Sequence, residues 1–411
     1  MNRITQCLHG RGTVSAVMRH RHGDRPVPGK YLAFAGMRRP VVFWNVTDRC
    51  NLSCTHCYSA SGPGSRTDSE LTTAEARAFI DDLAATGIPL VIFTGGEPLV
   101  RPDIRELAAY CREKGIGTAL STNGTLITGD GAAAIRRSGI GYAGISLDGA
   151  TAATHDRFRN CPGAFDRAVA AFARCREAGV RCGVRVTLTK ENQDELAALV
   201  DLARALGASR FCLYWLVPCG RGSDAYERLQ LDREEVTRAL ALLYRKAKEI
   251  SAEEMEFLTV DAPQDCIHLL QSMERDGSPD LEDAQGLLSS LNGGCSAGDR
   301  VANVDPRGNV YPCQFARSPE FLVGNIRDRP FSAIWNDNAN PVLARFRVKP
   351  PEVSGTCRSC TFLRLCGGGC RVRAWARTGN LAGEDPFCYV GKTGNGPTGA
   401  PSEEGSTFPE K

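Results

Sequence analysis

Three closely spaced cysteines, Cys50-x3-Cys54-x2-Cys57, are followed directly by Tyr58 and constrain this chain more than any other feature. Three thiolates on one loop can hold three corners of a cubane iron–sulfur cluster and leave the fourth iron open, whereas a cluster that serves only electron transfer normally takes four cysteine ligands. The alternative is a zinc site that adds His56 to the same cysteines, although zinc loops usually pair two C-x2-4-C units. The loop therefore predicts a cluster with one exchangeable iron.

Residues 41–216 alternate apolar runs of β type with amphipathic helical segments, which is typical of a parallel sheet built from repeated βα units. Strands are expected at 41–47, 90–94, 117–121, 142–147, 182–188 and 210–216. Helices are expected at 73–86, 102–114, 164–178, 193–206 and 232–250, the first of them with a capping box formed by Thr72 and Glu75. Six such units in about 175 residues predict an α/β fold with a partial (β/α)6 TIM-like barrel, because a complete barrel typically needs about 250 residues.

Polar motifs follow the predicted strands at the edge where parallel barrels carry their active sites. The cysteine loop follows the first strand, and the next three strands end at Gly95-Gly96-Glu97, Ser121-Thr122-Asn123 and Ser146-Leu147-Asp148. The fifth strand contributes Arg185 and Thr187. We expect these loops to converge on one rim, although each polar residue could instead be an ordinary strand-end cap.

The cysteine loop, together with Gly-Gly-Glu one βα unit later, resembles the radical S-adenosylmethionine (SAM) superfamily. The resemblance implies that Cys50, Cys54 and Cys57 hold a 4Fe–4S cluster whose open iron binds SAM, and that SAM is cleaved to methionine and a 5′-deoxyadenosyl radical that abstracts hydrogen from the substrate. The residues expected to bind SAM are Tyr58, Gly95, Gly96, Glu97, Ser121, Asn123, Ser146, Asp148 and Arg185. The hydrogen abstraction requires no side-chain acid or base, and the candidates for a catalytic role are Cys219 and Arg221, just past the sixth strand.

Seven further cysteines follow the pattern Cys295-x12-Gly308-x4-Cys313, Cys357-x2-Cys360-x5-Cys366-x3-Cys370 and Cys388. They resemble the SPASM domain, a C-terminal appendage of radical SAM enzymes that carries auxiliary iron–sulfur clusters. The resemblance implies one cluster on Cys357, Cys360, Cys366 and Cys388, and another on Cys295, Cys313 and Cys370. Residues 296–301 offer no fourth cysteine to the second set, so an open site, a non-cysteine ligand or a smaller cluster are alternatives, as is a structural zinc ribbon for the whole group.

A chain of 411 residues exceeds the usual size of a single core. We expect a basic N-terminal leader at 1–40, the barrel at 41–230, a helical bridge at 231–292, the SPASM domain at 293–390 and a disordered tail at 391–411. The net charge of +3 gives no reason to expect nucleic acid as a partner. No apolar stretch is long enough for a signal peptide or a membrane span, so we expect a cytoplasmic protein without a membrane partner.

Segments at 39–47, 216–222, 257–261 and 371–374 resemble the radical SAM proteins of tetrapyrrole tailoring, which act in haem d1 or alternative haem biosynthesis. This resemblance implies a sirohaem-derived substrate whose acetate or propionate side chains are removed or replaced in an oxidoreductase or lyase reaction, with an electron donor such as a flavodoxin or ferredoxin. Substrate carboxylates would suit Arg185, Arg221 and the basic leader. The alternatives are a maturase that modifies a ribosomal peptide or a client protein, which the short leader disfavours, and a non-enzymatic iron–sulfur or zinc scaffold, which the Gly-Gly-Glu loop disfavours.

Overall fold

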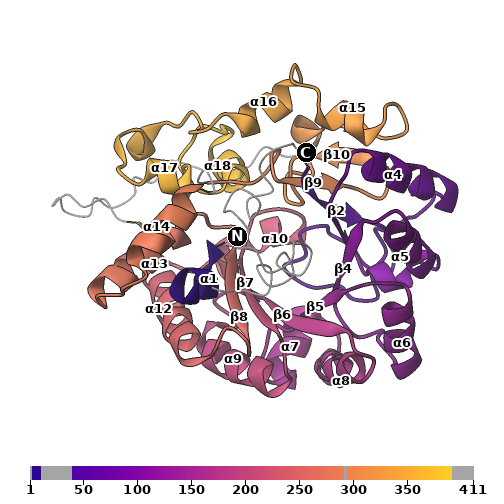
Figure 1. Cartoon of the computed structure of the whole chain (residues 1–411), viewed down its shortest axis with the longest axis horizontal. Helices are drawn as coiled ribbons and strands as arrows, with labels where there is room; N and C mark the ends of the chain where they lie inside the picture. The colour runs from indigo at the N-terminus through magenta and orange to yellow at the C-terminus, as the bar shows by residue number, and fades with distance from the viewer. Residues whose placement is uncertain (1, 11–38, 291–293, 391–411) are drawn as a thin grey trace.

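A computed structural model describes residues 2–10, 39–290 and 294–390 of the chain. Its strands form one sheet in the order β1-β8-β7-β6-β5-β4-β3-β2-β9-β10-β11 (Figure 1). The strands are β1 (Asn2–Arg3), β2 (Val41–Asn45), β3 (Leu90–Thr94), β4 (Gly117–Thr122), β5 (Tyr142–Ser146), β6 (Arg181–Leu188), β7 (Arg210–Trp215), β8 (Glu256–Val260), β9 (Val301–Val304), β10 (Asn309–Tyr311) and β11 (Gly324–Asn325).

The six strands expected from the sequence are present as β2 to β7, and each pairs in parallel with the next along the chain. The sheet curves, and most of the helices between these strands lie on its outer side (Figure 1). Side chains such as Val42, Phe93 and Leu213 are fully buried, as expected for parallel strands covered on both faces. The α/β fold with a partial barrel is therefore confirmed.

The described part of the barrel contains helices close to the five expected positions, at 73–85, 104–113, 164–177, 196–205 and 233–249, and others that the sequence did not predict, at 129–137, 152–159, 221–224 and 226–229. They are α4 (Thr73–Ala85), α5 (Ile104–Glu113), α6 (Gly129–Arg137), α7 (Ala152–Arg159), α8 (Ala164–Glu177), α9 (Leu196–Ala205), α10 (Arg221–Asp224), α11 (Tyr226–Leu229) and α12 (Arg233–Glu249). The Thr72 hydroxyl accepts from the backbone of Glu75, whose carboxylate accepts in turn from the backbone of Thr72, so the expected capping box is confirmed.

The segment expected to be a helical bridge at 231–292 also contributes a strand. It contains α12, α13 (Asp265–Arg275) and α14 (Leu281–Ser290), but β8 lies between the first two and pairs in parallel with β7. All five residues of β8 are buried. A short run without apolar alternation cannot be distinguished from a buried helical segment by periodicity, which explains why the sequence pattern did not reveal this strand.

The start of the predicted leader is part of the sheet. β1 pairs antiparallel with β8, and α1 (Ile4–His9) buries Ile4, Cys7 and Leu8 in the main core. These residues therefore belong to the barrel, although the sequence assigned them to a separate basic leader at 1–40. Residues 11–38 of that leader and the predicted tail at 391–411 lie outside the described residues.

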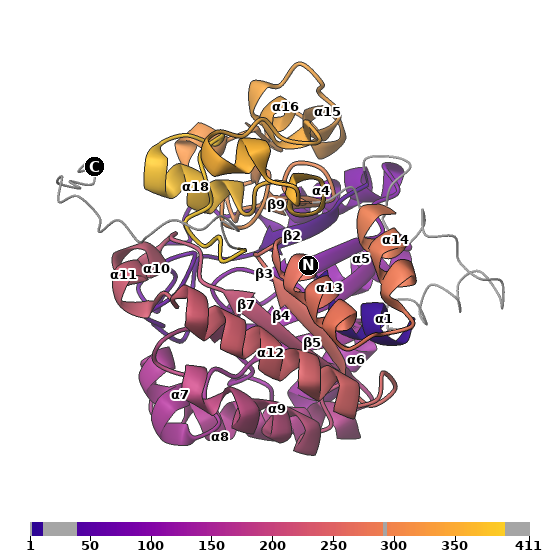
Figure 2. The ribbon, with the colours of Figure 1, turned by 90° about the vertical axis from the view of Figure 1, so that its left-hand side faces the viewer.

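The cysteine-rich C-terminal region joins the barrel through its first strand. β9 pairs in parallel with β2, from Val41 opposite Val301 to Trp44 opposite Val304, so parallel strands continue without a break from β8 to β9. The rest of the region packs above this edge as β10, β11 and short helices (Figure 2). These helices are α15 (Phe331–Trp335), α16 (Pro341–Arg347), α17 (Leu363–Cys366) and α18 (Arg371–Thr378).

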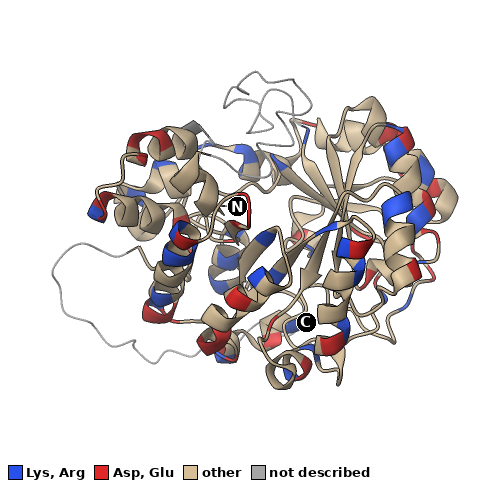
Figure 3. Cartoon of the chain, turned by 60° about the horizontal axis from the view of Figure 1, so that its bottom comes forward, with Lys and Arg blue, Asp and Glu red and all other residues tan. Residues whose placement is uncertain are grey.

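Positions of acidic and basic residues are interspersed along the outer helices (Figure 3). Within the described ranges, every helix is too short or too polar to cross a lipid bilayer.

Candidate active site

The three cysteines of the first motif lie on the loop that follows β2. The loop is closed at its base, where Cys50 N donates to Gly62 O over 3.2 Å beside a bridge between Arg49 and Gly62. Cys50, Cys54 and Cys57 all line one cavity at the C-terminal ends of the parallel strands. The structure thus brings the three thiols to the rim that the sequence predicts.

Each of these sulfur atoms has a polar neighbour. Leu52 N lies 3.4 Å from Cys50 Sγ, Arg159 Nη1 lies 3.6 Å from Cys54 Sγ, and Ser59 Oγ lies 3.4 Å from Cys57 Sγ. Hydrogen bonds to cysteine sulfur are a main means by which proteins stabilise and tune iron–sulfur clusters. The donor set therefore fits three thiolate ligands of such a cluster.

The zinc alternative is not supported. The His56 ring stacks on Phe158 with ring centroids 4.3 Å apart. Within the described ranges, no three His, Cys, Asp or Glu side chains are arranged to hold a single metal ion. A zinc ion needs its ligands to converge on one point, whereas a cluster takes each thiol on a different iron.

The two glycines of Gly95-Gly96-Glu97 are required by the crossing of two backbones. A Cβ on Gly95, whose φ is +139°, would lie 2.5 Å from Thr47 O, and a Cβ on Gly96 would lie 2.1 Å from Arg49 O. Gly96 N donates to Thr47 O over 2.8 Å, so this loop is bonded to the start of the cysteine loop. Both glycines also line the cavity, as expected of SAM-binding residues, but the contact that excludes a side chain is with the protein itself.

Glu97 lies behind the cavity wall. Its carboxylate is fully buried and accepts from Thr122 Oγ1 and Asn123 N, each over 2.8 Å, and from Leu99 N over 3.1 Å. Burial raises the pKa of Glu97 to about 7, although these hydrogen bonds oppose the shift. In this structure Glu97 ties the end of β3 to the end of β4, so its predicted role toward SAM would act through the loop that it holds.

Asp148 is likewise fully buried outside the cavity lining. It forms an ion pair with Arg159 and accepts from Thr187 N over 2.7 Å. Arg159, at the end of α7, is the residue that reaches the cavity and Cys54. Sequence reasoning did not identify Arg159, since no motif marks it and its partner is recognisable only in three dimensions.

The remaining predicted SAM-binding side chains line the cavity: Tyr58, Ser121, Asn123, Ser146 and Arg185. The Asn123 amide donates to Asn51 Oδ1 over 2.9 Å and so also supports the cysteine loop. Tyr58 Oη accepts from Asn45 Nδ2 over 3.0 Å. Arg185 is held over the ring of Tyr214, with its guanidinium carbon 4.6 Å from the ring centroid. Whether these residues contact SAM stays a prediction.

Asp261 is a cavity residue to which sequence reasoning gave no role. It follows β8 in a left-handed conformation with φ of 74°, and its Oδ2 is buried without a hydrogen-bond partner among the described residues. Burial raises its pKa to about 7, opposed chiefly by Arg373. A strained, unpartnered carboxylate at a cavity is typical of a functional position.

The two candidate catalytic residues after β7 do not line this cavity. Arg221 donates from Nε to Cys54 O over 2.8 Å and from Nη2 to Ser61 O over 2.9 Å, so its guanidinium supports the cysteine loop. Gly220 makes this approach possible, because a Cβ there would lie 2.4 Å from Cys57 O. Cys219 faces the C-terminal domain, in the apolar cluster that contains Cys313 and Cys370.

The cysteines of the C-terminal region fall into the two expected sets. Cys357, Cys360, Cys366 and Cys388 line one small cavity, together with Gln264 and Ile267 from the barrel. Cys295, Cys313 and Cys370 belong to a separate apolar cluster. All of them are free thiols, as iron–sulfur ligation requires.

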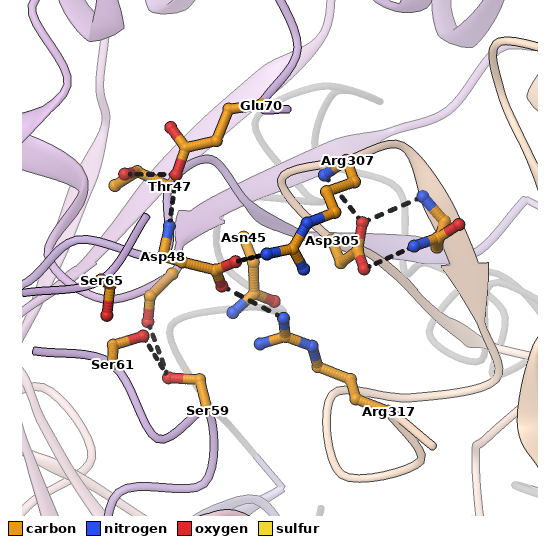
Figure 4. Close-up of polar contacts among 12 residues, drawn as sticks. Asn45, Thr47, Asp48, Ser59, Ser61, Ser65, Glu70, Asp305, Arg307 and Arg317 are labelled. Atoms are coloured by element: carbon orange, nitrogen blue, oxygen red, sulfur yellow. Dashed lines mark hydrogen bonds and ion pairs between the residues drawn. The ribbon is translucent and has the colours of Figure 1, made fainter. Parts of the chain in front are cut away.

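An ionic junction connects the start of the cysteine loop to the C-terminal domain (Figure 4). Asp48 Oδ1 lies 3.3 Å from Arg317 Nη2, and Asp48 Oδ2 lies 3.3 Å from Arg307 Nη2. Asp48 N donates to Glu70 over 2.7 Å, which fixes the backbone from which this carboxylate projects. The two thiol-bearing regions are therefore held in a defined relation beside the cavity.

A three-thiol loop open to a cavity, at the C-terminal edge of a parallel sheet that also carries a thiol-rich domain, defines an iron–sulfur enzyme. Comparison with known proteins identifies the family. Residues 44–203 match the model of the radical SAM superfamily, and residues 295–361 match the SPASM model of an iron–sulfur cluster-binding domain. The chain belongs to the radical SAM superfamily, and its cofactors are a 4Fe–4S cluster with SAM and the auxiliary iron–sulfur clusters of the SPASM domain.

Similarity to individual proteins extends over nearly the whole chain. It is 39% identical to the Fe-coproporphyrin III synthase of Methanosarcina barkeri over 388 residues, covering 93% of this chain and 96% of that protein. It is 37% identical to the pre-heme d1 synthase of Dinoroseobacter shibae over 365 residues, covering 86% and 87%. The crystal structure of Streptococcus suis SuiB bound to S-adenosylmethionine has the same fold, with a TM-score of 0.68, 19% identity and coverage of 92% of this chain and 80% of that one.

Proposed function

We propose that this protein is a radical SAM enzyme that removes or replaces carboxylate-bearing side chains of a sirohaem-derived tetrapyrrole. The observation that carries the proposal is that Cys50, Cys54 and Cys57 line the same cavity as Arg185. The similarity to enzymes named for iron-coproporphyrin and pre-heme d1 synthesis supports a tetrapyrrole as the substrate.

Cys50, Cys54 and Cys57 would hold the 4Fe–4S cluster, which when reduced would supply the electron for reductive cleavage of SAM and so the means of hydrogen abstraction. The protein's part is to bind and orient. The backbone of Gly95 and Gly96 and the side chains of Tyr58, Ser121 and Ser146 are the surfaces proposed for SAM. The hydrophobic wall of Leu216, Val217 and Phe315 would keep water from the reacting carbon.

Arg185 is the residue proposed to bind a substrate carboxylate. It is a permanent cation on the cavity wall, and stacking on Tyr214 fixes the plane of its guanidinium. A planar guanidinium suits the geometry of a carboxylate, of which a sirohaem-derived macrocycle carries several. Arg221, by contrast, is proposed to position the cysteine loop, since its donors are engaged with carbonyl oxygens there. The electron donor is proposed to be a flavodoxin or ferredoxin.

The deciding experiment incubates the anaerobically reconstituted protein with dithionite, SAM and either sirohaem or didecarboxysirohaem. Chromatography should detect 5′-deoxyadenosine, and mass spectrometry should detect a macrocycle with altered side chains. Cys54→Ala should abolish both products, whereas Cys111→Ala, which removes a buried thiol on α5, should abolish neither. Release of 5′-deoxyadenosine with an unchanged macrocycle would contradict the tetrapyrrole proposal and favour a peptide or client-protein substrate.

A further inference from the structure

The C-terminal set of Cys295, Cys313 and Cys370 provides three thiols, and residues 296–301 provide no fourth. In the structure these three belong to one apolar cluster of the C-terminal domain, in which Cys313 and Cys370 are buried. A fully ligated cubane needs one more ligand. A side chain from elsewhere in the described ranges would have to supply this ligand.

Cys219 packs against the same apolar cluster. It comes from the barrel, on the turn after β7, and lies between Val217, which also belongs to the cluster, and Gly220. Its thiol donates to Val217 O over 3.4 Å, a weak bond that a metal could replace. Burial raises the pKa of the Cys219 thiol, as expected for a sulfur held away from solvent.

The backbone of the turn at Cys219 is held in place by contacts with the first cysteine loop. Gly220 has φ of +54°, and a Cβ at this position would lie 2.4 Å from Cys57 O. Arg221 N donates to Cys57 O over 3.0 Å. The backbone of the turn is therefore held against the first cysteine loop. The side chain of Cys219 packs on the cluster that contains the thiols of the C-terminal domain.

Other side chains are less suited to this position. Asp385, the buried carboxylate beside Cys370, already accepts from Cys370 N over 2.7 Å and from Arg373 Nε over 3.0 Å. Of the cysteines outside the three assigned sets, Cys7, Cys111, Cys175, Cys182 and Cys266 lie in the main core, Cys161 bonds to Arg167 near the surface, and Cys212 lies within β7.

We propose that Cys219 is the fourth ligand of the auxiliary iron–sulfur cluster held by Cys295, Cys313 and Cys370, so that the barrel and the C-terminal domain share one cluster. The proposal rests on the assignment of those three cysteines to one auxiliary site. Four thiolates leave no iron open for substrate, so this cluster would serve electron transfer. Because Gly220, the residue after Cys219, lies against the backbone of Cys57, the shared cluster would be close to the first cysteine loop.

The test compares full-length Cys219→Ala, Cys370→Ala and Cys212→Ala with the unsubstituted protein after anaerobic reconstitution. Iron and sulfide are counted, and Mössbauer and EPR spectra are recorded. We expect Cys370→Ala to remove one spectral component, and Cys219→Ala to lose that same component or convert it to a 3Fe–4S form. The Cys212→Ala control should match the unsubstituted protein, and the first cluster should still respond to SAM in all three variants.

Combining Cys219→Ala with Cys370→Ala should remove no more iron than Cys370→Ala alone. If Cys219→Ala fails to fold, Cys219→Ser preserves the size of the side chain and should shift the spectrum of this component through an oxygen ligand. An unaltered component in a folded Cys219 variant would overturn the proposal, as would Cys370→Ala retaining all its iron. In either case, release of 5′-deoxyadenosine together with an altered macrocycle by the unsubstituted protein would show that the proposed function still stands.

Discussion

Arg159 Nη1 lies 3.6 Å from the sulfur of Cys54, so a cation contacts one of the three thiols of the first cysteine motif. Its other partner is Asp148, with which it forms an ion pair in which both side chains are almost completely buried. The fourth and fifth parallel strands are joined to this pair, because Asp148 follows β5 and accepts from Thr187 N of β6. A ligand of the predicted cluster is thus connected to the barrel through one arginine.

Replacing Arg159 should destabilise the protein because it leaves the Asp148 carboxylate buried without its cation. Arg159→Gln should lower the free energy of unfolding by about 3–5 kcal/mol, the usual result of removing one partner of a buried pair. Asp148→Asn combined with Arg159→Gln should recover part of that loss. Denaturant unfolding of the four proteins in this double-mutant cycle measures the coupling, and additive effects would show that the two residues act independently.

Replacing Arg221 should affect the cysteine loop and not the affinity for substrate. Arg221→Lys loses the fork that reaches both Cys54 O and Ser61 O, at a cost of about 1 kcal/mol for each hydrogen bond. We expect faster loss of iron to a chelator with an unchanged KM for substrate. Arg228→Lys, in the neighbouring helix α11, is the matched control because its ion pair with Glu191 lies away from the loop. A raised KM with normal iron retention would instead favour substrate binding by Arg221.

Replacing Glu97 should weaken SAM binding by loosening the wall of the cavity. Glu97→Gln cannot accept all three hydrogen bonds from Leu99 N, Thr122 Oγ1 and Asn123 N, so at least one buried donor would face an amide NH2. We expect the Kd for SAM, measured by calorimetry on reconstituted protein, to rise about 10-fold, equivalent to about 1.4 kcal/mol. The exposed Glu113→Gln should leave it unchanged, and iron content should stay constant in both variants.

The sequence predicted the parallel strands and the rim because apolar periodicity and cysteine spacing are local properties. It could not predict β8, whose five buried residues lack alternation, nor the addition of β9 to the edge of the barrel. Those features depend on which surfaces meet after folding. The same limit applies to the site: the thiol sets follow from spacing, but the placement of Arg159 on Cys54 and of Cys219 beside the C-terminal thiols depends on contacts between distant segments.

The Gly95-Gly96 motif shows a second limit of prediction from sequence. Gly95 and Gly96 are expected from the sequence to bind SAM, and they do line the cavity. Their missing side chains are nevertheless required by the backbone at Thr47 and Arg49. A motif can therefore be recognised correctly while the physical reason for its residues differs from the one inferred.

Asp261 should make substrate binding depend on pH near neutrality. Burial raises its pKa to about 7, so its side chain is neutral below that pH and negative above it. A substrate rich in carboxylates would be repelled by the negative form, so its KM should rise as the pH increases from about 6 to about 8. The same titration should lower the free energy of unfolding of the ligand-free protein as the pH rises through this range, because the folded state holds the proton more tightly than the unfolded state.

Asp261→Asn removes the titrating group but keeps a side chain that tolerates the left-handed conformation at φ of 74°. Its KM for the macrocycle should vary less with pH than that of the unsubstituted protein, and near pH 8 it should be lower. Release of 5′-deoxyadenosine without substrate is the internal control, since it reports cleavage of SAM independently of macrocycle binding. If the pH dependence of KM persisted unchanged in Asp261→Asn, another group would have to be responsible, and the unpartnered carboxylate at the end of β8 would have no part in recognising the substrate.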